Sequence, residues 1–291
     1  MTEDPDNAPD NATMPLMEHL IELRRRLIIS LAVFVVVFLG AYHFAHDIYG
    51  FLVRPLSEIL KERGGDRRMI YTGLTEAFLT YVKVAAFTAA FVCFPVWAGQ
   101  LWAFVAPGLY KKERRALLPF LVATPVLFVA GAASVYFMVI PMAWKFFLSF
   151  ESTGIDTGGV PIQLEAKVSE YLSLVMKLIF AFGIAYQMPV AFTLLARVGI
   201  IGSKDLIAKW RYAVVGVFVA AAVLTPPDIV SQLSLATPML ALYGISILSC
   251  KWVERGRQNA AAGDAVAGEA ASGEAAAAAD APSTGGEPAK E

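Results

Sequence analysis

The chain has 291 residues, of which 57% are hydrophobic and 17% are charged, and its formal net charge is −1. Soluble domains contain roughly 45–50% apolar and about 25% charged residues, so this composition excludes a soluble enzyme with one buried core and indicates a polytopic membrane protein. No run of basic residues is longer than three, which gives no support to nucleic-acid binding.

The first 13 residues are polar and acidic. This is the reverse of the basic start of a cleavable signal peptide, so we expect a polar cytoplasmic N-terminus before a membrane domain over residues 16–255.

Apolar stretches predict the membrane spans, because a transmembrane helix needs about 20 apolar residues. Stretches that are free of acidic and basic residues, the last broken only by Asp228, cover 27–46, 84–110, 116–144, 178–196 and 212–250. The last one cannot be a single helix, since Pro226 and Pro227 remove backbone donors and clash with the preceding turn. Pro226, Pro227 and Asp228 therefore predict a tight turn between two short spans, which makes six.

The distribution of basic residues predicts the orientation. Fourteen Lys and Arg residues flank the span ends on the side of the N-terminus, and seven lie in the loops of the other side. Positive charge favours the cytoplasmic side, so both termini are expected inside. The first outer loop carries periodic apolar residues that indicate a short helix. The tail over residues 256–291 is rich in Ala, Gly and acid, and its composition predicts disorder.

Three polar residues allow two interpretations each. Glu22 faces Arg25 and Arg26 at helical spacing, so it forms either a surface ion pair or part of an acceptor for a cationic ligand. Glu113 either balances the four cations around it or belongs to the same acceptor. Gln187 lies deep in the fourth span, where it needs a hydrogen-bond partner. That partner is either a neighbouring helix of the bundle or a polar group of another protein.

Prolines lie within or beside most spans and predict kinked helices, so the expected fold is an all-α, kinked and concave six-helix membrane bundle with short last helices. The sequence contains no catalytic motif and no pattern of metal ligands or cofactor-binding residues. It therefore indicates no enzyme. Cys93 and Cys250 lie in apolar runs and are interpreted as buried small hydrophobes.

Several motifs resemble those of the TatC family, the receptor subunits of the twin-arginine protein translocase. They occur in order along residues 16–255 and are the segments His19 to Arg26, Phe104 to Arg115, Tyr171 to Ser173, Ala181 to Gly183 and Leu224 to Asp228. Pro55 matches a proline of the family's first outer loop. Gln187 stands where the family often has Glu, which favours a hydrogen-bonding role over an ionisable switch.

The resemblance implies a receptor that binds twin-arginine signal peptides at the cytoplasmic face. With the single-span partners TatA and TatB, it would export folded proteins across a bacterial inner membrane in an oligomeric complex driven by the proton gradient. Glu22 and Glu113 match the acidic residues implicated in recognising the two arginines. The other residues expected at that site belong to the same two motifs: His19, Leu20, Arg24, Phe104, Tyr110 and Arg115.

Two alternative functions stay open on the residues alone. An intramembrane enzyme is the weaker of them, because the sequence offers no nucleophile and base. A proton- or ion-coupled secondary transporter would need a polar site near the middle of the membrane, for which Glu170, Lys177 and Gln187 are the candidates.

Overall fold

The structure, a computed structural model, describes residues 16–62, 69–105, 118–151, 159, 164–225 and 229–279. The elements in chain order are α1 (Leu16–His43), α2 (Ala45–Glu62), α3 (Glu76–Val105), α5 (Leu118–Ser134), the π-helix η2 (Val135–Val139), α6 (Ile140–Phe147), the 3-10 helix η3 (Leu148–Phe150), α7 (Val168–Ala185), α8 (Met188–Val198), α9 (Ser203–Ala208), α10 (Trp210–Leu224) and α11 (Ile229–Ala279).

Five helices or helix series are long and apolar enough to cross a membrane: α1, α3, the series α5 to η3, α7 with α8, and α11. α10 is apolar but only 15 residues long, about 22 Å at 1.5 Å per residue. The prediction of an all-helical membrane bundle is confirmed for the described residues. The count of six spans and the orientation stay predictions.

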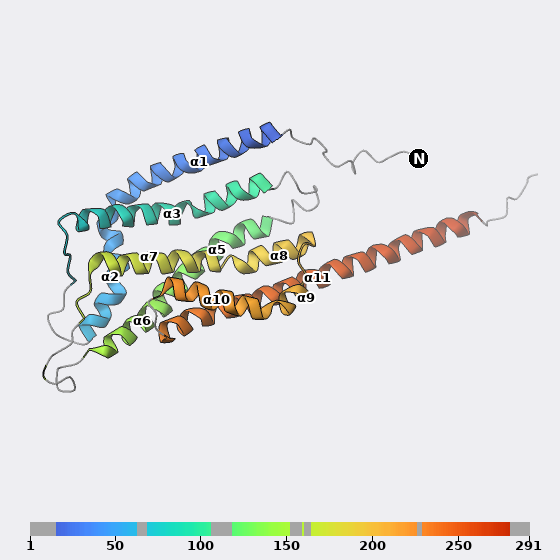
Figure 1. Cartoon of the computed structure of the whole chain (residues 1–291). Helices are drawn as coiled ribbons and strands as arrows, with labels where there is room; N and C mark the ends of the chain where they lie inside the picture. The colour runs from blue at the N-terminus through green and yellow to red at the C-terminus, as the bar shows by residue number, and fades with distance from the viewer. Residues whose placement is uncertain are drawn as a thin grey trace, which may run out of the picture.

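The long helices run side by side, as Figure 1 shows. α1 begins at one end of this bundle, where α3 and α8 finish, and we call this the α1 end. α2 lies across the opposite end, which we call the α2 end, and confirms the short helix expected in the first loop. α1 lies at the edge of the bundle beside α3, and α11 extends beyond the other helices.

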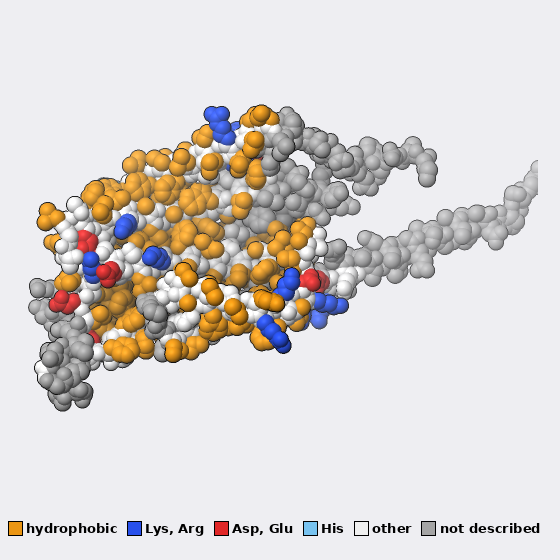
Figure 2. Space-filling model, in the orientation of Figure 1, with side chains coloured by type: hydrophobic (Ala, Val, Ile, Leu, Met, Phe, Trp, Pro, Cys, Tyr) orange, Lys and Arg blue, Asp and Glu red, His pale blue; other side chains and the backbone are white. Residues whose placement is uncertain are grey.

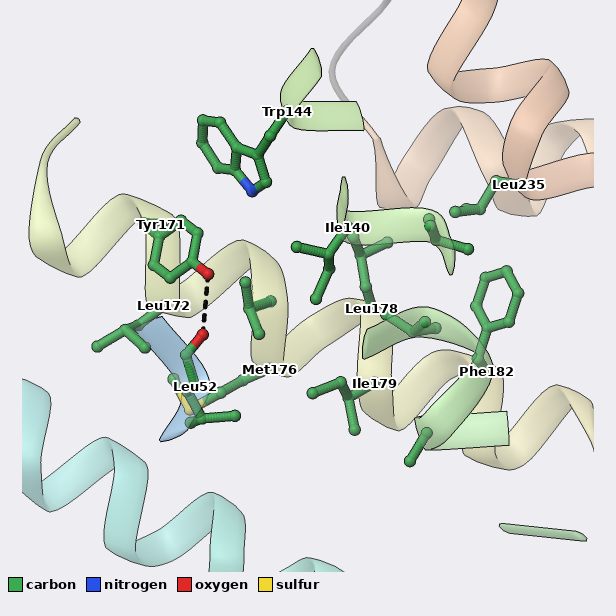
Figure 3. Packing of buried hydrophobic residues seen from close by; sticks show 14 of the residues in the cluster. Leu52, Ile140, Trp144, Tyr171, Leu172, Met176, Leu178, Ile179, Phe182 and Leu235 are labelled. Carbon is green, nitrogen blue, oxygen red and sulfur yellow. Dashed lines mark hydrogen bonds between the residues drawn. The ribbon is translucent and has the colours of Figure 1, made fainter. Parts of the chain in front are cut away.

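α2 is held on the bundle through backbone carbonyls near Pro55, which is buried within this helix. Because proline has no N–H, the carbonyl of Phe51 loses its usual donor four residues on. The Tyr136 hydroxyl donates to this oxygen at 2.8 Å. The Tyr171 hydroxyl donates to the Leu52 carbonyl, also at 2.8 Å, as Figure 3 shows. The helix series after α5 and the start of α7 are thereby joined to α2.

The loops at the α2 end are joined to each other. Ile70 and Lys167 form an isolated parallel bridge. Close by, the Ser169 hydroxyl donates to Glu76 Oε1 at 2.5 Å. Since Glu76 begins α3 and Ser169 lies in the first turn of α7, these contacts fix the starts of the two helices relative to each other.

The core lies where α2, α3, α7 and the series after α5 meet, and Figure 3 shows part of it. α5 and α7 approach closely through two glycines. A Cβ atom on Gly131 would lie 2.7 Å from the Phe182 carbonyl oxygen, and one on Gly183 would lie 2.5 Å from the Phe128 ring. Any larger residue would push the two helices apart.

α9, a short helix between α8 and α10, is fastened to α11 at two points: the Tyr243 hydroxyl donates to the Leu206 carbonyl at 2.8 Å, and the Glu254 carboxylate binds the start of α9. Glu254 accepts hydrogen bonds from the backbone N–H and from the hydroxyl of Ser203, each at 2.5 Å. Ser203 is the first residue of α9, so this carboxylate satisfies groups that have no partner within the helix.

The structure describes part of the C-terminal tail but not the N-terminal 15 residues. The backbone of α11 is helical as far as Ala279, whereas composition predicted disorder from residue 256. Its many alanines, which have the highest helix propensity, account for the difference. The polar N-terminus (1–15) and Pro226, Pro227 and Asp228 lie outside the described residues, so the domain boundaries stay predictions.

Candidate functional site

Glu22 and Arg26 form a half-buried ion pair at the α1 end. Oε1 of Glu22 accepts from both Nη2 (2.5 Å) and Nε (3.0 Å) of Arg26. Arg26 also donates to Gln100 Oε1 at 3.2 Å and to the Ala103 carbonyl at 3.0 Å. The pair thus joins α1 to the last turns of α3. The exposed fractions are 22% for the Arg26 side chain and 24% for that of Glu22.

The ion pair shows one of the two interpretations of Glu22, with Arg26 rather than Arg25 as its partner. It leaves Oε2 of Glu22 without a hydrogen bond from any described residue. A cationic ligand therefore has an acceptor oxygen available, or it can replace Arg26 on Oε1.

The other residues expected at the signal-peptide site are only partly described. Leu20 and Arg24 are exposed on α1, and Phe104 is half-buried near the end of α3. His19 lies within α1, but its side chain is outside the described part. The expectations for Glu113, Tyr110 and Arg115 fall on residues that the structure does not describe.

Gln187 lies at a break between α7 and α8. Pro189 lacks the N–H that a continuous helix would require, so α7 ends at Ala185 and α8 begins at Met188. At this break the Gln187 backbone N–H bonds to the Ile184 carbonyl instead of that of Gly183. The side-chain Nε2 donates to the freed Gly183 carbonyl at 3.3 Å and to the Thr124 carbonyl on α5 at 3.1 Å. The amide therefore joins α5 to α7 at the place where the helix hydrogen bonds between α7 and α8 are interrupted.

The other side-chain atom of Gln187 has no such partner. Among the described residues, Oε1 is the buried side-chain oxygen that accepts no hydrogen bond. Leaving a buried acceptor unpaired costs about 1–3 kcal/mol. The amide therefore offers an acceptor to a group that enters from outside the chain.

An apolar groove adjoins this amide, with a volume of about 670 Å³. Its lining comes from α3, α5, α7 and α8 and consists of Phe94, Trp97, Ala98, Leu101, Thr124, Phe180, Ile184, Gln187, Val190, Ala191, Leu194 and Leu195. The groove is apolar except at Thr124 and Gln187. Its chemistry suits an apolar helix or chain segment that carries a hydrogen-bond donor.

Sequence reasoning missed the parts of the site that depend on contacts between helices. Gln100 and the Ala103 carbonyl anchor Arg26. The one signal of this contact in the sequence is that Gln100 is polar and lies near the end of an apolar run. The partners of Gln187 on α5 and α7 are backbone carbonyls, which carry no side-chain signal. No group of three or more potential metal ligands occurs among the described residues.

The fold and the site define a multi-pass membrane protein with an apolar groove and a half-buried carboxylate at one end. Residues 18–238 match the family of the Sec-independent protein translocase protein (TatC). The chain belongs to the TatC family.

Curated relatives and solved structures agree with this assignment. The TatC of Magnetococcus marinus is 47% identical over 250 residues, which cover 86% of this chain and 89% of the relative. The TatC of Escherichia coli K12 is 39% identical over 246 residues, or 84% and 92% of the two chains. A crystal structure of the twin-arginine translocase receptor TatC superposes with a TM-score of 0.70 at 34% identity and covers 81% of this chain and 99% of that one.

Proposed function

We propose that this chain is the receptor component of a twin-arginine translocase and binds twin-arginine signal peptides at the α1 end. The half-buried carboxylate of Glu22, which keeps one oxygen free of described partners, is the observation that carries the proposal. The names of its relatives and of the matching crystal structures support the translocase role. We place the α1 end in the cytoplasm and the chain in a bacterial inner membrane.

Carboxylates suit this task because a guanidinium group presents planar, two-pronged donors. Two consecutive arginines offer two such groups, and Glu22 and Glu113 supply two acceptors. Arg26 already shows how a guanidinium sits on Glu22, with two nitrogens on one oxygen. Lysine cannot bind in this forked manner, so an arginine-to-lysine change in the cargo is expected to weaken binding.

The test is site-specific crosslinking of a twin-arginine precursor to Glu22→Gln, Glu113→Gln and double variants in membranes. Each charge-assisted bond contributes about 1.5–3 kcal/mol, so each single variant should bind about tenfold to a hundredfold more weakly. The double variant should lose less than the sum, because both residues serve one site.

An exposed acid elsewhere provides the control: Glu58→Gln at the α2 end should leave the crosslink unchanged, since the described ion pair of Glu58 is with Arg54 on its own helix. If the double variant crosslinks as the wild type does, the two glutamates only balance the arginines around them and the proposal fails.

We further propose that the groove at Gln187 receives a helix of a single-span partner of the TatA or TatB type, within an oligomeric complex that uses the proton gradient. Gln187→Leu removes the unpaired acceptor while keeping the side chain similar in volume. It should reduce the amount of partner that co-purifies, and leave membrane insertion intact.

The matched control for that experiment is Gln258→Leu, which changes an exposed glutamine of α11 outside the groove. Equal partner recovery from Gln187→Leu and the wild type would show that Gln187 serves only the bundle. The reported relatives are translocase proteins, so the comparisons do not support the transporter alternative. We propose no enzymatic reaction.

A further inference from the structure

Two exposed lysines interrupt the apolar spans of α3 and α7. Lys83 is the eighth residue of α3 and Lys177 is the tenth residue of α7. Figure 2 shows Lys or Arg side chains among hydrophobic ones on the face over these helices. Neither lysine forms an ion pair with a described residue. Charged groups within membrane spans are costly and need a partner.

The register of the two helices brings these lysines to the same level. α3 and α7 both start at the α2 end and run in the same direction. The rings of Phe87 and Phe180 are in contact, with centroids 6.3 Å apart. Lys83 precedes Phe87 by four residues, and Lys177 precedes Phe180 by three. On each helix the lysine therefore lies on the same face as the phenylalanine, about one turn closer to the α2 end. The two lysines therefore lie at about the same level on two adjacent helices.

The nearest acids along the same helices are already engaged. Glu76, seven residues before Lys83, accepts hydrogen bonds from Ser169 and from two backbone N–H groups. Glu170, seven residues before Lys177, lies 3.8 Å from the ammonium of Lys167. Seven residues correspond to about 10 Å along a helix. Both ammonium groups thus lack a carboxylate partner from these helices among the described residues.

The length of α3 places the Lys83 backbone just inside the hydrocarbon edge, within a lysine side chain's reach of lipid phosphates. Its 30 residues span about 45 Å, which matches a bilayer including its headgroups at about 40–45 Å. The start of α3 therefore lies at the edge of the headgroup region. Side chains on a helix lean toward its N-terminus, and lysine extends its charge along a long stem. Both ammonium groups are thereby directed to the headgroup layer.

We propose that Lys83 and Lys177 bind the phosphate of an anionic phospholipid in the leaflet at the α2 end. One phosphodiester placed between the two lysines accepts charge-assisted hydrogen bonds from both and neutralises part of their charge. The acyl chains then lie along Phe87 and Phe180, on the apolar face that leads toward the groove. A zwitterionic lipid carries its own cation and satisfies this site less well.

The test measures lipid binding to the full-length chain in detergent by native mass spectrometry, with phosphatidylglycerol or phosphatidylcholine added. The wild type should prefer phosphatidylglycerol, and Lys83→Gln/Lys177→Gln should lose that preference by about tenfold to thirtyfold, given the contribution of each lysine near an anionic surface. Lys83→Arg/Lys177→Arg keeps both charges and should retain the preference. Lys145→Gln changes a single exposed lysine on α6 and should have no effect.

Three results would overturn the proposal. The first is a double glutamine variant that keeps the wild-type preference, which would mean that the lysines only extend toward water. The second is glycerol phosphate competing as well as the lipid, which would make the site one for free phosphate. The third is unchanged lipid binding together with loss of a co-purifying single-span protein, which would assign the ammonium groups to a partner's carboxylate.

Discussion

At the scale of single residues, contacts with backbone atoms shape this molecule as much as contacts between side chains. Gln187 bonds to two carbonyls, and Arg26 reaches the Ala103 carbonyl as well as Glu22. Such contacts fix the distance between helices more tightly than apolar packing alone, because a backbone oxygen cannot move without its helix.

Among the described glycines, Gly131 is the one at which an added Cβ atom would come closest to the backbone of a neighbouring helix. Gly131→Ala would place a Cβ atom 2.7 Å from the Phe182 carbonyl oxygen and should destabilise the protein by about 1–3 kcal/mol through overpacking. The measurement is the thermal unfolding midpoint in detergent, which should fall by several degrees. Gly244→Ala in α11 is the control, since a Cβ there meets nothing within 4 Å. An equal midpoint for both variants would show that α5 and α7 separate freely.

At the scale of helices, prolines set where the spans bend and where a carbonyl lies free. The π-helix η2 comes just before Pro141, the α7–α8 break comes just before Pro189, and Pro55 lies inside α2. Near Pro55 and at the α7–α8 break, a side chain donates a hydrogen bond to a backbone carbonyl. The kinks predicted from the sequence thus also serve as places where helices are joined.

A double-mutant cycle on Pro55 and Tyr136 tests this at the α2 end. Tyr136→Phe removes the donor to the Phe51 carbonyl and should cost about 1–3 kcal/mol of unfolding free energy. In a Pro55→Ala background the backbone N–H of residue 55 can supply that bond, so the same change should cost less.

The companion cycle uses Tyr171→Phe, which loses its bond to Leu52. Residue 56 carries a backbone N–H in both backgrounds, so the cost of Tyr171→Phe should not depend on residue 55. Urea or thermal unfolding of the purified proteins gives all the values required. Equal costs of Tyr136→Phe in both backgrounds would rule out proline as the reason for the tyrosine contact.

The sequence predicted the helices better than their ends and breaks. Stretches without charges marked the apolar cores of the spans, but α1 starts eleven residues before Leu27 and α7 starts ten before Leu178. Charged residues continue a helix once it leaves the hydrocarbon, so a rule based on missing charges shortens both. The α7–α8 break has a signal in Pro189, whereas the close approach at Gly131 depends on tertiary packing that no local pattern records.

The same division holds for the site. Helical spacing was enough to pair Glu22 with an arginine three or four residues on, and the structure selects Arg26 because Gln100 and Ala103 hold it. The predicted position of Gln187 deep in the fourth span was enough to show that its side chain needs a hydrogen-bond partner. That position did not show which groups the side chain would contact, because one is the Gly183 carbonyl freed by the helix break and the other is a backbone carbonyl of α5.

For the whole molecule, the described helices do not provide a passage for a folded protein. The groove of about 670 Å³ has the size of a small-molecule pocket, and α10 at 15 residues is short for a hydrocarbon layer of about 30 Å. A short span thins or distorts the lipid around it. Translocation by this chain is therefore expected only within an assembly.

Reconstitution in liposomes examines that expectation directly. The purified chain alone should bind a twin-arginine precursor without transporting it, and transport should require added TatA- and TatB-type proteins together with a proton gradient. Protease protection of the cargo inside the vesicles is the measurement. Protection with the isolated chain would mean that the six predicted spans suffice.

The contact between Glu254 and Ser203 determines where this polypeptide can be shortened or fused. A cut or a reporter placed before residue 254 removes the carboxylate that holds the first turn of α9, even though every helix up to α10 remains intact. A truncation that keeps Tyr243 is expected to loosen the start of α9 and to expose it to proteases, while the Tyr243 hydroxyl still binds the Leu206 carbonyl of that helix. A fusion placed after Gln258 keeps that anchor, so it is the suitable attachment point for purification tags and fluorescent labels.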